Sequence, residues 1–194
     1  SNDSTSVTFG TTEYSAITNW TSAGAMATDT WANQNADNKN VLRAETTVGG
    51  LKVSISSNMV QLTQAAPTQA QKDAAASGAT DPVSLTIGGS LGGASYVIAN
   101  EGSKMGIAAT TAIGGATLTT AYSTAPTRTT GDLTTAPTDD ASAMNTSTGI
   151  KIAYPMGAIV ATASYVMEGT GTCTDVLPAV CAVNKDTWDI SAVW

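Results

Sequence analysis

The chain has 194 residues and a formal net charge of −7, and only 12 % of its residues are charged, against ~25 % in a typical soluble domain. Its eight Lys and Arg residues are spread singly and form no basic patch, so we expect no nucleic-acid partner. There is no histidine, which removes Ser-His-Asp and Cys-His catalysis and His-ligated zinc, and no other motif indicates an enzyme.

The first forty residues contain short strand signals followed by a polar loop. The sequence starts at Ser1 without a basic or apolar leader, so we expect any signal peptide to have been removed. Residues 6–19 hold the alternating SVTFG and then YSAITN, which predict one or two short strands. Residues 21–39 are rich in small and amide side chains, with Trp31 as the large apolar anchor. A loop of this length inside a domain is uncommon and often functional.

The clearest strand signal is NVLRAETTVGGLKVSISSN, at residues 40–58. Apolar and polar side chains alternate on both sides of Gly49-Gly50, and glycine takes the positive φ that a two-residue hairpin turn needs. This unit of strand, tight turn and strand recurs three times, and a last strand follows. The expected units are residues 82–100 with a turn at Gly92-Gly93, 104–122 with a turn at Gly114-Gly115, 150–165 with a turn at Pro155-Met156-Gly157, and the strand 187–194.

Long polar loops are expected at residues 60–82, 123–147 and 167–186. Short turns therefore lie at one end of the strands and long loops at the other, a pattern typical of outer-membrane barrels. The strands, of about eight to eleven residues, suit a tilted crossing of a bilayer, whereas no apolar run approaches the ~20 residues of a membrane-spanning helix. The expected fold is an all-β, antiparallel up-and-down transmembrane β-barrel, or the part of one that this chain covers.

Two of the loops carry residues with possible covalent or metal chemistry. Cys173 and Cys181 are either plain thiols or a local disulfide, and their Thr/Ser-rich, Pro-containing surroundings favour the disulfide and an oxidising compartment. Asp139 and Asp140 are the candidates for a calcium ion at the cell surface. An adjacent acidic pair is more often solvated, so we expect neither a metal nor another cofactor.

The two faces of the expected strands differ in chemistry. One face is apolar, and the other carries Ser, Thr, Gly and isolated charges, as the lining of a water-filled pore would. The basic residues of the expected strands do not fall on the apolar face, and a charge at mid-bilayer costs roughly 2–4 kcal/mol in a barrel. These residues are Arg43, Lys52, Lys104 and Lys151. Because a soluble sandwich alternates in the same way, both architectures stay open, with the barrel favoured. The aromatic residues on the apolar face are Tyr96, Tyr122, Tyr154, Tyr165, Trp188 and Trp194.

A family resemblance strengthens the barrel interpretation. The stretches LRAETTVGGLKVSIS, VSLTIGGSLGGASYVIANEGS, KMGIAATTAIGGATLTTAYS and GIKIAYPMGAIVATASYVM resemble strand pairs of bacterial general-diffusion porins, over roughly residues 40–194. The resemblance implies an outer-membrane location, a 16-stranded barrel, a homotrimer, and a loop that folds into the lumen as a constriction. The chain provides about nine or ten strands, so we expect it to be a portion of such a porin, with residues 21–39 as the constriction loop.

The expected function is passive diffusion of small hydrophilic solutes and ions through a water-filled channel, with membrane lipid around it. In such a channel the charged side chains in the lumen set the ion preference. Asp29 and Asp37, in the candidate constriction loop, would face basic residues across the pore. Pore-lining candidates by alternation are Arg43, Glu45, Lys52, Lys104, Lys151 and Asp189.

A second hypothesis comes from a different class of protein. A secreted β-sandwich, serving as a surface-layer, fimbrial or adhesin subunit without a pore, explains the Thr/Ala/Gly-rich composition and the loop cysteines equally well. It predicts a protein that is soluble without detergent, with its charges on an exposed sheet face.

Overall fold

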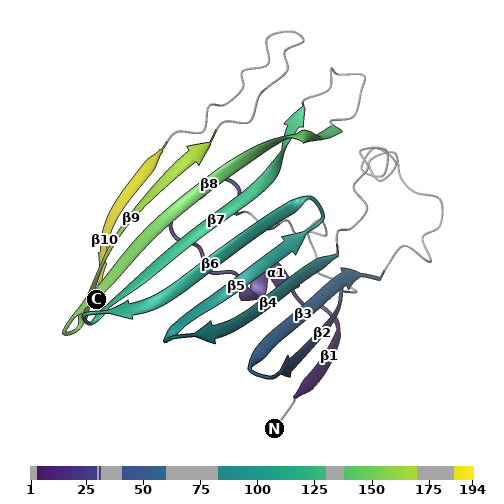
Figure 1. Ribbon diagram of the computed structural model, residues 1–194, viewed down its shortest axis with the longest axis horizontal. Helices are drawn as coiled ribbons and strands as arrows, with labels where there is room; N and C mark the ends of the chain where they lie inside the picture. Colours follow the sequence, from purple (N-terminus) through teal and green to yellow (C-terminus); the bar gives the residue numbers. More distant parts are fainter. Residues whose placement is uncertain (1–3, 30, 32–40, 60–82, 130–137, 170–185) are drawn as a thin grey trace.

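The computed structural model describes residues 4–29, 31, 41–59, 83–129, 138–169 and 186–194, and this part of the chain forms one antiparallel sheet. Ten strands follow one another in chain order, each paired with the next (Figure 1). The predicted all-β, up-and-down architecture is therefore confirmed. β1 and β10 form the two edges of the sheet, and no strand pairing between them is found among the described residues.

Ten strands and one short helix make up the regular structure of the described residues. They are β1 Thr5–Gly10, α1 Ser15–Asn19, β2 Val41–Val48, β3 Leu51–Asn58, β4 Ser84–Leu91, β5 Ala94–Glu101, β6 Lys104–Ile113, β7 Ala116–Thr129, β8 Thr138–Met156, β9 Ile159–Gly169 and β10 Thr187–Val193.

Two-residue turns join β2 to β3, β4 to β5, β6 to β7 and β8 to β9, all at one end of the sheet. At the first of them Gly49 and Gly50 have φ values of 58° and 82°, a left-handed conformation that glycine adopts at no steric cost. The predicted fourth turn is displaced, because Pro155 pairs with Val160 and the turn is Gly157-Ala158. At the opposite end, the connection from β5 to β6 is equally short.

The structure corrects the predicted strand at YSAITN, which is largely the helix α1. The main-chain N–H of Thr18 donates to the carbonyl of Tyr14 at 3.1 Å, and the Asn19 side chain donates to the carbonyl of Ser15 at 3.0 Å. Ile and Thr favour strands on propensity alone, but this segment takes part in no strand pairing of the described sheet. Its polar groups bond instead to side chains of the sheet, as described below.

The structure also corrects the limits of two predicted loops. Much of 123–147 is strand, since β7 continues to Thr129 and β8 begins at Thr138, and residues 167–169 belong to β9. The β7–β8 pairing shifts register between Pro126 and Thr127, an irregularity that accommodates a proline without an N–H. Thr is common in β-strands, so this Thr-rich stretch can pair as a strand although its polar composition predicted a loop. The predicted loop 60–82 lies outside the described residues.

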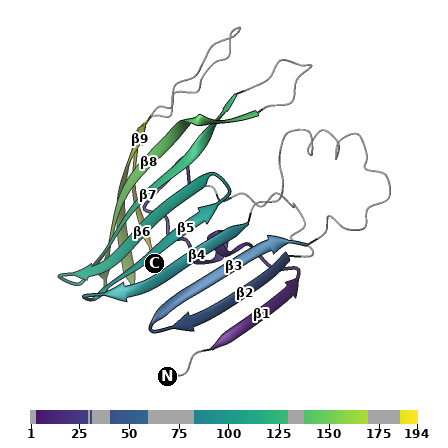
Figure 2. The ribbon, with the colours of Figure 1, turned by 45° about the vertical axis from the view of Figure 1, so that its right-hand side comes forward.

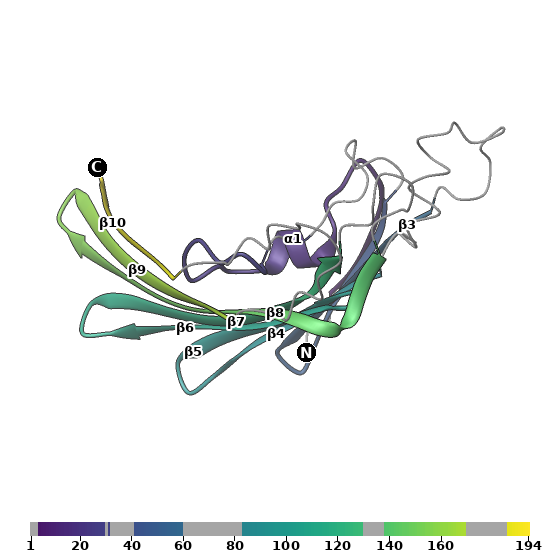
Figure 3. The same ribbon diagram turned by 90° about the horizontal axis from the view of Figure 1, so that it is seen from above.

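The sheet is strongly curved, and residues 11–29 with Trp31 lie against its concave side (Figures 2 and 3). We call these residues the crossing segment. It leaves β1, forms α1 over β3 and β4, and continues across the sheet toward β8 and β9 (Figure 3). The crossing segment thus begins before residue 21, where the sequence placed the start of the candidate constriction loop.

Candidate functional site

The convex face of the sheet is apolar, and no element among the described residues covers it. Ile107, Tyr122 and Ile150, on the middle strands, are 48 %, 44 % and 47 % exposed. Soluble monomers rarely expose contiguous apolar patches larger than a few hundred Å². This face therefore needs an apolar environment or partner. Its side chains line up across neighbouring strands, for example in the row Val53, Ile87, Ile98, Ile107 and Tyr122 from β3 to β7.

Aromatic side chains share the convex face. Tyr165 pairs with Trp188 of β10, and Tyr154 pairs with Ala161, four residues or ~13 Å from Tyr165 along β9.

The concave face carries small side chains where the crossing segment lies on it. A Cβ added at Gly106 of β6 would stand 2.6 Å from the indole Cη2 of Trp20, and one at Gly149 of β8 would stand 3.0 Å from the Cβ of Ala23. The seam beneath the segment is apolar and dry rather than the wet lumen expected along the whole face. Ala23, Met26, Val97, Ala108, Ala121 and Val166 form its main buried cluster, with Trp20 packed against them.

Buried serines of the sheet hold the start of the crossing segment. Ser15 donates its main-chain N–H to Ser56 Oγ at 2.7 Å, and its hydroxyl lies 2.8 Å from Ser54 Oγ. The N–H of Ala16 donates to Ser84 Oγ at 2.9 Å. The first N–H groups of a helix have no partner within it, so these hydroxyls satisfy donors that would otherwise be buried and unpaired.

A group of three charged residues on β2 and β3 holds the end of α1. Lys52 Nζ lies 3.3 Å from Glu45 Oε1 and donates to Asn19 Oδ1 at 2.9 Å. Arg43 lies 3.9 Å from Glu45 Oε2 and donates to the Thr18 hydroxyl at 2.8 Å. These predicted residues are thus brought together on the concave face, and two of them bind the crossing segment directly.

The far end of the crossing segment is anchored on β7, β8 and β9. Lys151 Nζ donates to the carbonyl of Ser22 at 2.8 Å, and the N–H of Ala27 donates to Glu168 Oε1 at 2.9 Å. Thr28 donates its N–H to Ser147 Oγ at 3.2 Å, and the Ser147 hydroxyl donates in turn to Glu168. The segment is therefore bonded at both ends and packed in between.

Other predicted residues stand apart from this network. Asp29 accepts the indole N–H of Trp20 at 3.1 Å, so its carboxylate serves the packing within the segment, beside a 5.0 Å edge-to-face contact of Trp20 and Trp31. Lys104 opens β6 next to the short connection from β5, and Asp189 lies exposed in β10. Asp37, Cys173 and Cys181 lie outside the described residues. Asp139 and Asp140 fall in β8 opposite Arg128 and Thr127.

Sequence reasoning missed Glu168 and the anchoring serines. Glu168 alternates onto the concave face with Ser164 and Val166, and alternation alone could have found it. The serines gave no such signal, because buried hydroxyls and solvated ones look alike in sequence. The distinction depends on the crossing segment that covers them.

The described residues contain no group of three or more His, Cys, Asp or Glu side chains able to hold a metal ion. Nor does any helix in this part of the chain have the length and hydropathy that a transmembrane helix needs.

Comparisons with known proteins found no matching family model, no similar curated protein and no similar solved structure. The function must therefore be argued from the geometry of the two faces.

Proposed function

We propose that this chain forms part of the wall of an outer-membrane porin, a water-filled channel for passive diffusion of small hydrophilic solutes and ions. The observation that carries the proposal is the chemical division of the sheet. Its convex face exposes large apolar side chains along the strands, while Arg43, Glu45, Lys52, Lys151 and Glu168 stand on the concave side. Lipid outside and water inside account for that division.

The crossing segment supports the same function. A polar-anchored segment over the concave face narrows the space inside a curved wall, and charges placed there act on passing ions. Arg43, Glu45, Lys52 and Lys151 remain the proposed pore-lining residues, with Lys104 and Asp189 toward the margins. Asp29 is proposed as part of the constriction through its position, although it is bonded to Trp20. The resemblance to porins further implies a homotrimer, which belongs to the proposal.

Membrane insertion sets a condition on the sheet edges. Unpaired backbone groups cost several kcal/mol each in hydrocarbon, so a sheet in a bilayer must close. In the membrane, β1 and β10 must therefore pair either with further strands or with each other. We propose further strands, consistent with a larger barrel of which ten strands are described here.

The competing function, a β-sandwich subunit of a surface layer, fimbria or adhesin, requires a second layer over the convex face. No element among the described residues covers that face, which leaves Trp188 and Ile190 at 74 % and 72 % exposed. The two hypotheses therefore differ in what contacts the apolar side chains, which is lipid for the porin and protein for the sandwich.

Extraction and conductance test the proposal. The protein should remain with the outer membrane until detergent is added, and the purified protein should open stepwise, ohmic channels in a planar lipid bilayer. Recovery as a detergent-free soluble monomer, or a well-inserted protein that conducts no ions, would contradict it.

A further inference from the structure

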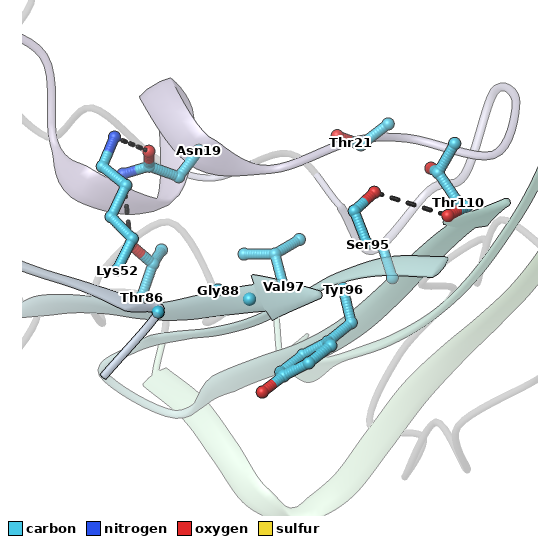
Figure 4. A pocket seen from close by; sticks show the side chains of 12 residues that line it. Asn19, Thr21, Lys52, Thr86, Gly88, Ser95, Tyr96, Val97 and Thr110 are labelled. Carbon is cyan, nitrogen blue, oxygen red and sulfur yellow. Dashed lines mark hydrogen bonds between the residues drawn. The ribbon is translucent and has the colours of Figure 1, made fainter. Parts of the chain in front are cut away.

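A cavity of about 290 Å³ lies between the crossing segment and the sheet, on the side of the segment that faces the Gly49-Gly50 turn. Asn19 and Thr21 bound it from the crossing segment, and Gly88 and Val97 bound it from β4 and β5 (Figure 4). Its volume is close to the lower limit of small-molecule sites, roughly 300 Å³. A single small ring fits such a space, whereas a chain of rings does not.

The polar groups of this cavity are held in place by bonds to one another. Asn19 donates its side-chain N–H to Thr86 Oγ1 at 3.1 Å and accepts from Lys52 Nζ at 2.9 Å, so its amide is fixed on one side (Figure 4). On the other side, Ser95 donates to the carbonyl of Thr110 at 3.4 Å. Ordered donors and acceptors bind a ligand at a smaller entropic cost than mobile ones.

The chemistry of the lining selects one class of ligand. Its charge is a single ammonium, Lys52, which Glu45 partly offsets at 3.3 Å, so neither an anion nor a cation is strongly favoured. Tyr96 borders the cavity with its backbone while its ring points to the other side of the sheet, so a flat aromatic ligand finds no stacking partner there (Figure 4). Hydroxyl groups remain the main feature, and a hydroxyl both donates and accepts.

We propose that this cavity is a binding site, on the path of the permeating solute, for a neutral polyol of the size of one sugar ring. Ligand hydroxyls would bond to Thr110, to Ser95 and to the side-chain oxygen of Asn19, whose two N–H groups are already used. Val97 and Ala108 would contact the C–H face of the ring. Lys52 has three N–H donors, of which two serve Asn19 and Glu45, so the third would donate to a ligand hydroxyl. The inference rests on the proposed channel function, because only there does the ligand become a transported solute.

Gly88 gives the most direct test of the location. Its backbone φ is not left-handed, and a Cβ there would meet only the Tyr96 carbonyl, at 3.3 Å. Gly88→Val therefore places a branched side chain in the cavity and reduces its volume, while keeping every polar group of the lining. Thr110→Val removes one hydroxyl without changing the side-chain shape. Thr162→Val, the same replacement on β9, is the matched control on the same face of the sheet outside the cavity.

Binding is measured with D-glucose by saturation-transfer NMR on the full protein in detergent, with conductance recorded in parallel. We expect a millimolar dissociation constant in the parent protein and in Thr162→Val, since a binding site inside a channel must also release its solute. Thr110→Val should weaken it roughly three- to tenfold, the value of one net hydrogen bond. Gly88→Val should weaken it more than tenfold. Circular dichroism confirms that each variant is folded.

The outcomes separate this inference from the channel proposal. Conductance without glucose binding overturns the polyol site but not the channel proposal. Glucose binding without conductance overturns the channel proposal but not binding in the cavity. Binding that survives in Gly88→Val places the ligand elsewhere and overturns the assignment. Gluconate binding more tightly than glucose would also overturn it, because the site would then select charge.

Discussion

At the scale of single residues, buried serine hydroxyls do much of the work of holding the crossing segment. Ser54, Ser56 and Ser84 are 0–1 % exposed and meet polar groups of Ser15 and Ala16. A short hydroxyl suits this position because it accepts a main-chain N–H and leaves room for the helix above it. The charged residues, by contrast, bind the segment farther along, from the end of α1 to Ala27.

Ser84→Ala tests this role. The change leaves the buried N–H of Ala16 without its acceptor, and an unsatisfied buried donor costs roughly 1–3 kcal/mol. We expect a loss of free energy of unfolding in that range, with faster hydrogen exchange at Ala16. Ser90→Ala, on the same strand and face but exposed, is the control and should change the stability by less than about 0.5 kcal/mol. Equal effects of both changes would contradict the assigned role.

Asp186 gives a pH-dependent prediction at the junction of β9 and β10. Its carboxylate accepts the Glu168 N–H at 3.0 Å and the Tyr165 hydroxyl at 2.9 Å, and these two bonds, the first more strongly, lower the pKa of Asp186 below its ordinary 3.8. A lowered carboxyl pKa stabilises the folded state fully above the ordinary pKa, and the stabilisation is lost as the pH falls through the lowered value.

Protection of the Glu168 amide from hydrogen exchange should therefore decrease as the pH falls below 3.8 and through the lowered pKa of Asp186. In Asp186→Asn the side chain no longer titrates, so this acid-dependent step should disappear. All other side chains are common to both proteins, so the difference between their profiles isolates Asp186. Identical profiles would exclude the carboxylate as the source of the effect.

At the scale of elements, the crossing segment depends on a track of small residues in the sheet. Gly106 has no side chain where Trp20 and Trp31 pack, and a Cβ there would stand 2.6 Å and 3.1 Å from their ring atoms. Overpacking of this kind typically costs 1–3 kcal/mol. Gly106→Val should therefore lift the middle of the segment without breaking its anchors at Ser84 or Glu168.

For Gly106→Val we expect a larger single-channel conductance and faster proteolysis within the crossing segment. Ala112→Val, an exposed site on the same face of β6, should leave both unchanged. A Gly106→Val protein with unchanged conductance and normal protease resistance would show that the segment does not narrow the pore.

The strands were largely predictable from the sequence, whereas the crossing segment that covers them, with its helix α1, was not. Alternation around Gly49-Gly50 and its repeats placed eight strands and their faces, because the pleat imposes a period of two. α1 was missed since the serines of β3 and β4 that stabilise it are about forty to seventy residues away in sequence. Local propensity at Ile17 and Thr18 indicated a strand, and the tertiary hydrogen bonds override it. The extended β7–β8 hairpin was missed because its Thr, Pro and Asp residues read as loop.

The candidate site was predictable only in part, for a related reason. Arg43, Glu45, Lys52 and Lys151 follow from the face on which alternation places them. Their partners do not, since Asn19 and Ser22 belong to a segment without periodicity. The dry seam at Ala108 and Gly106 is likewise invisible in sequence, where a small residue facing water looks the same as one beneath a tryptophan.

At the scale of the whole molecule, the two faces of one sheet meet different surroundings. The convex face has no covering layer among the described residues, and the concave face is covered across its middle by the crossing segment (Figure 3). A porin in a bilayer and an uncovered sheet in solution make opposite demands on the convex face, since a lysine near the middle of the hydrocarbon costs roughly 2–4 kcal/mol whereas a lysine on a water-exposed face costs little.

Two neighbouring lysine substitutions on β8 exploit this difference. Ile152 is 46 % exposed on the convex face, and Ala153 follows it on the concave face. In lipid vesicles Ile152→Lys should reduce the free energy of unfolding by about 2–4 kcal/mol, the cost of a lysine within the apolar band. Ala153→Lys should reduce it by less than about 1 kcal/mol. Folding yield and the urea midpoint measure both. In detergent-free buffer a soluble sheet with an open convex face would tolerate Ile152→Lys and gain solubility from it. That result, combined with no difference between the two variants in vesicles, would contradict a lipid-facing wall.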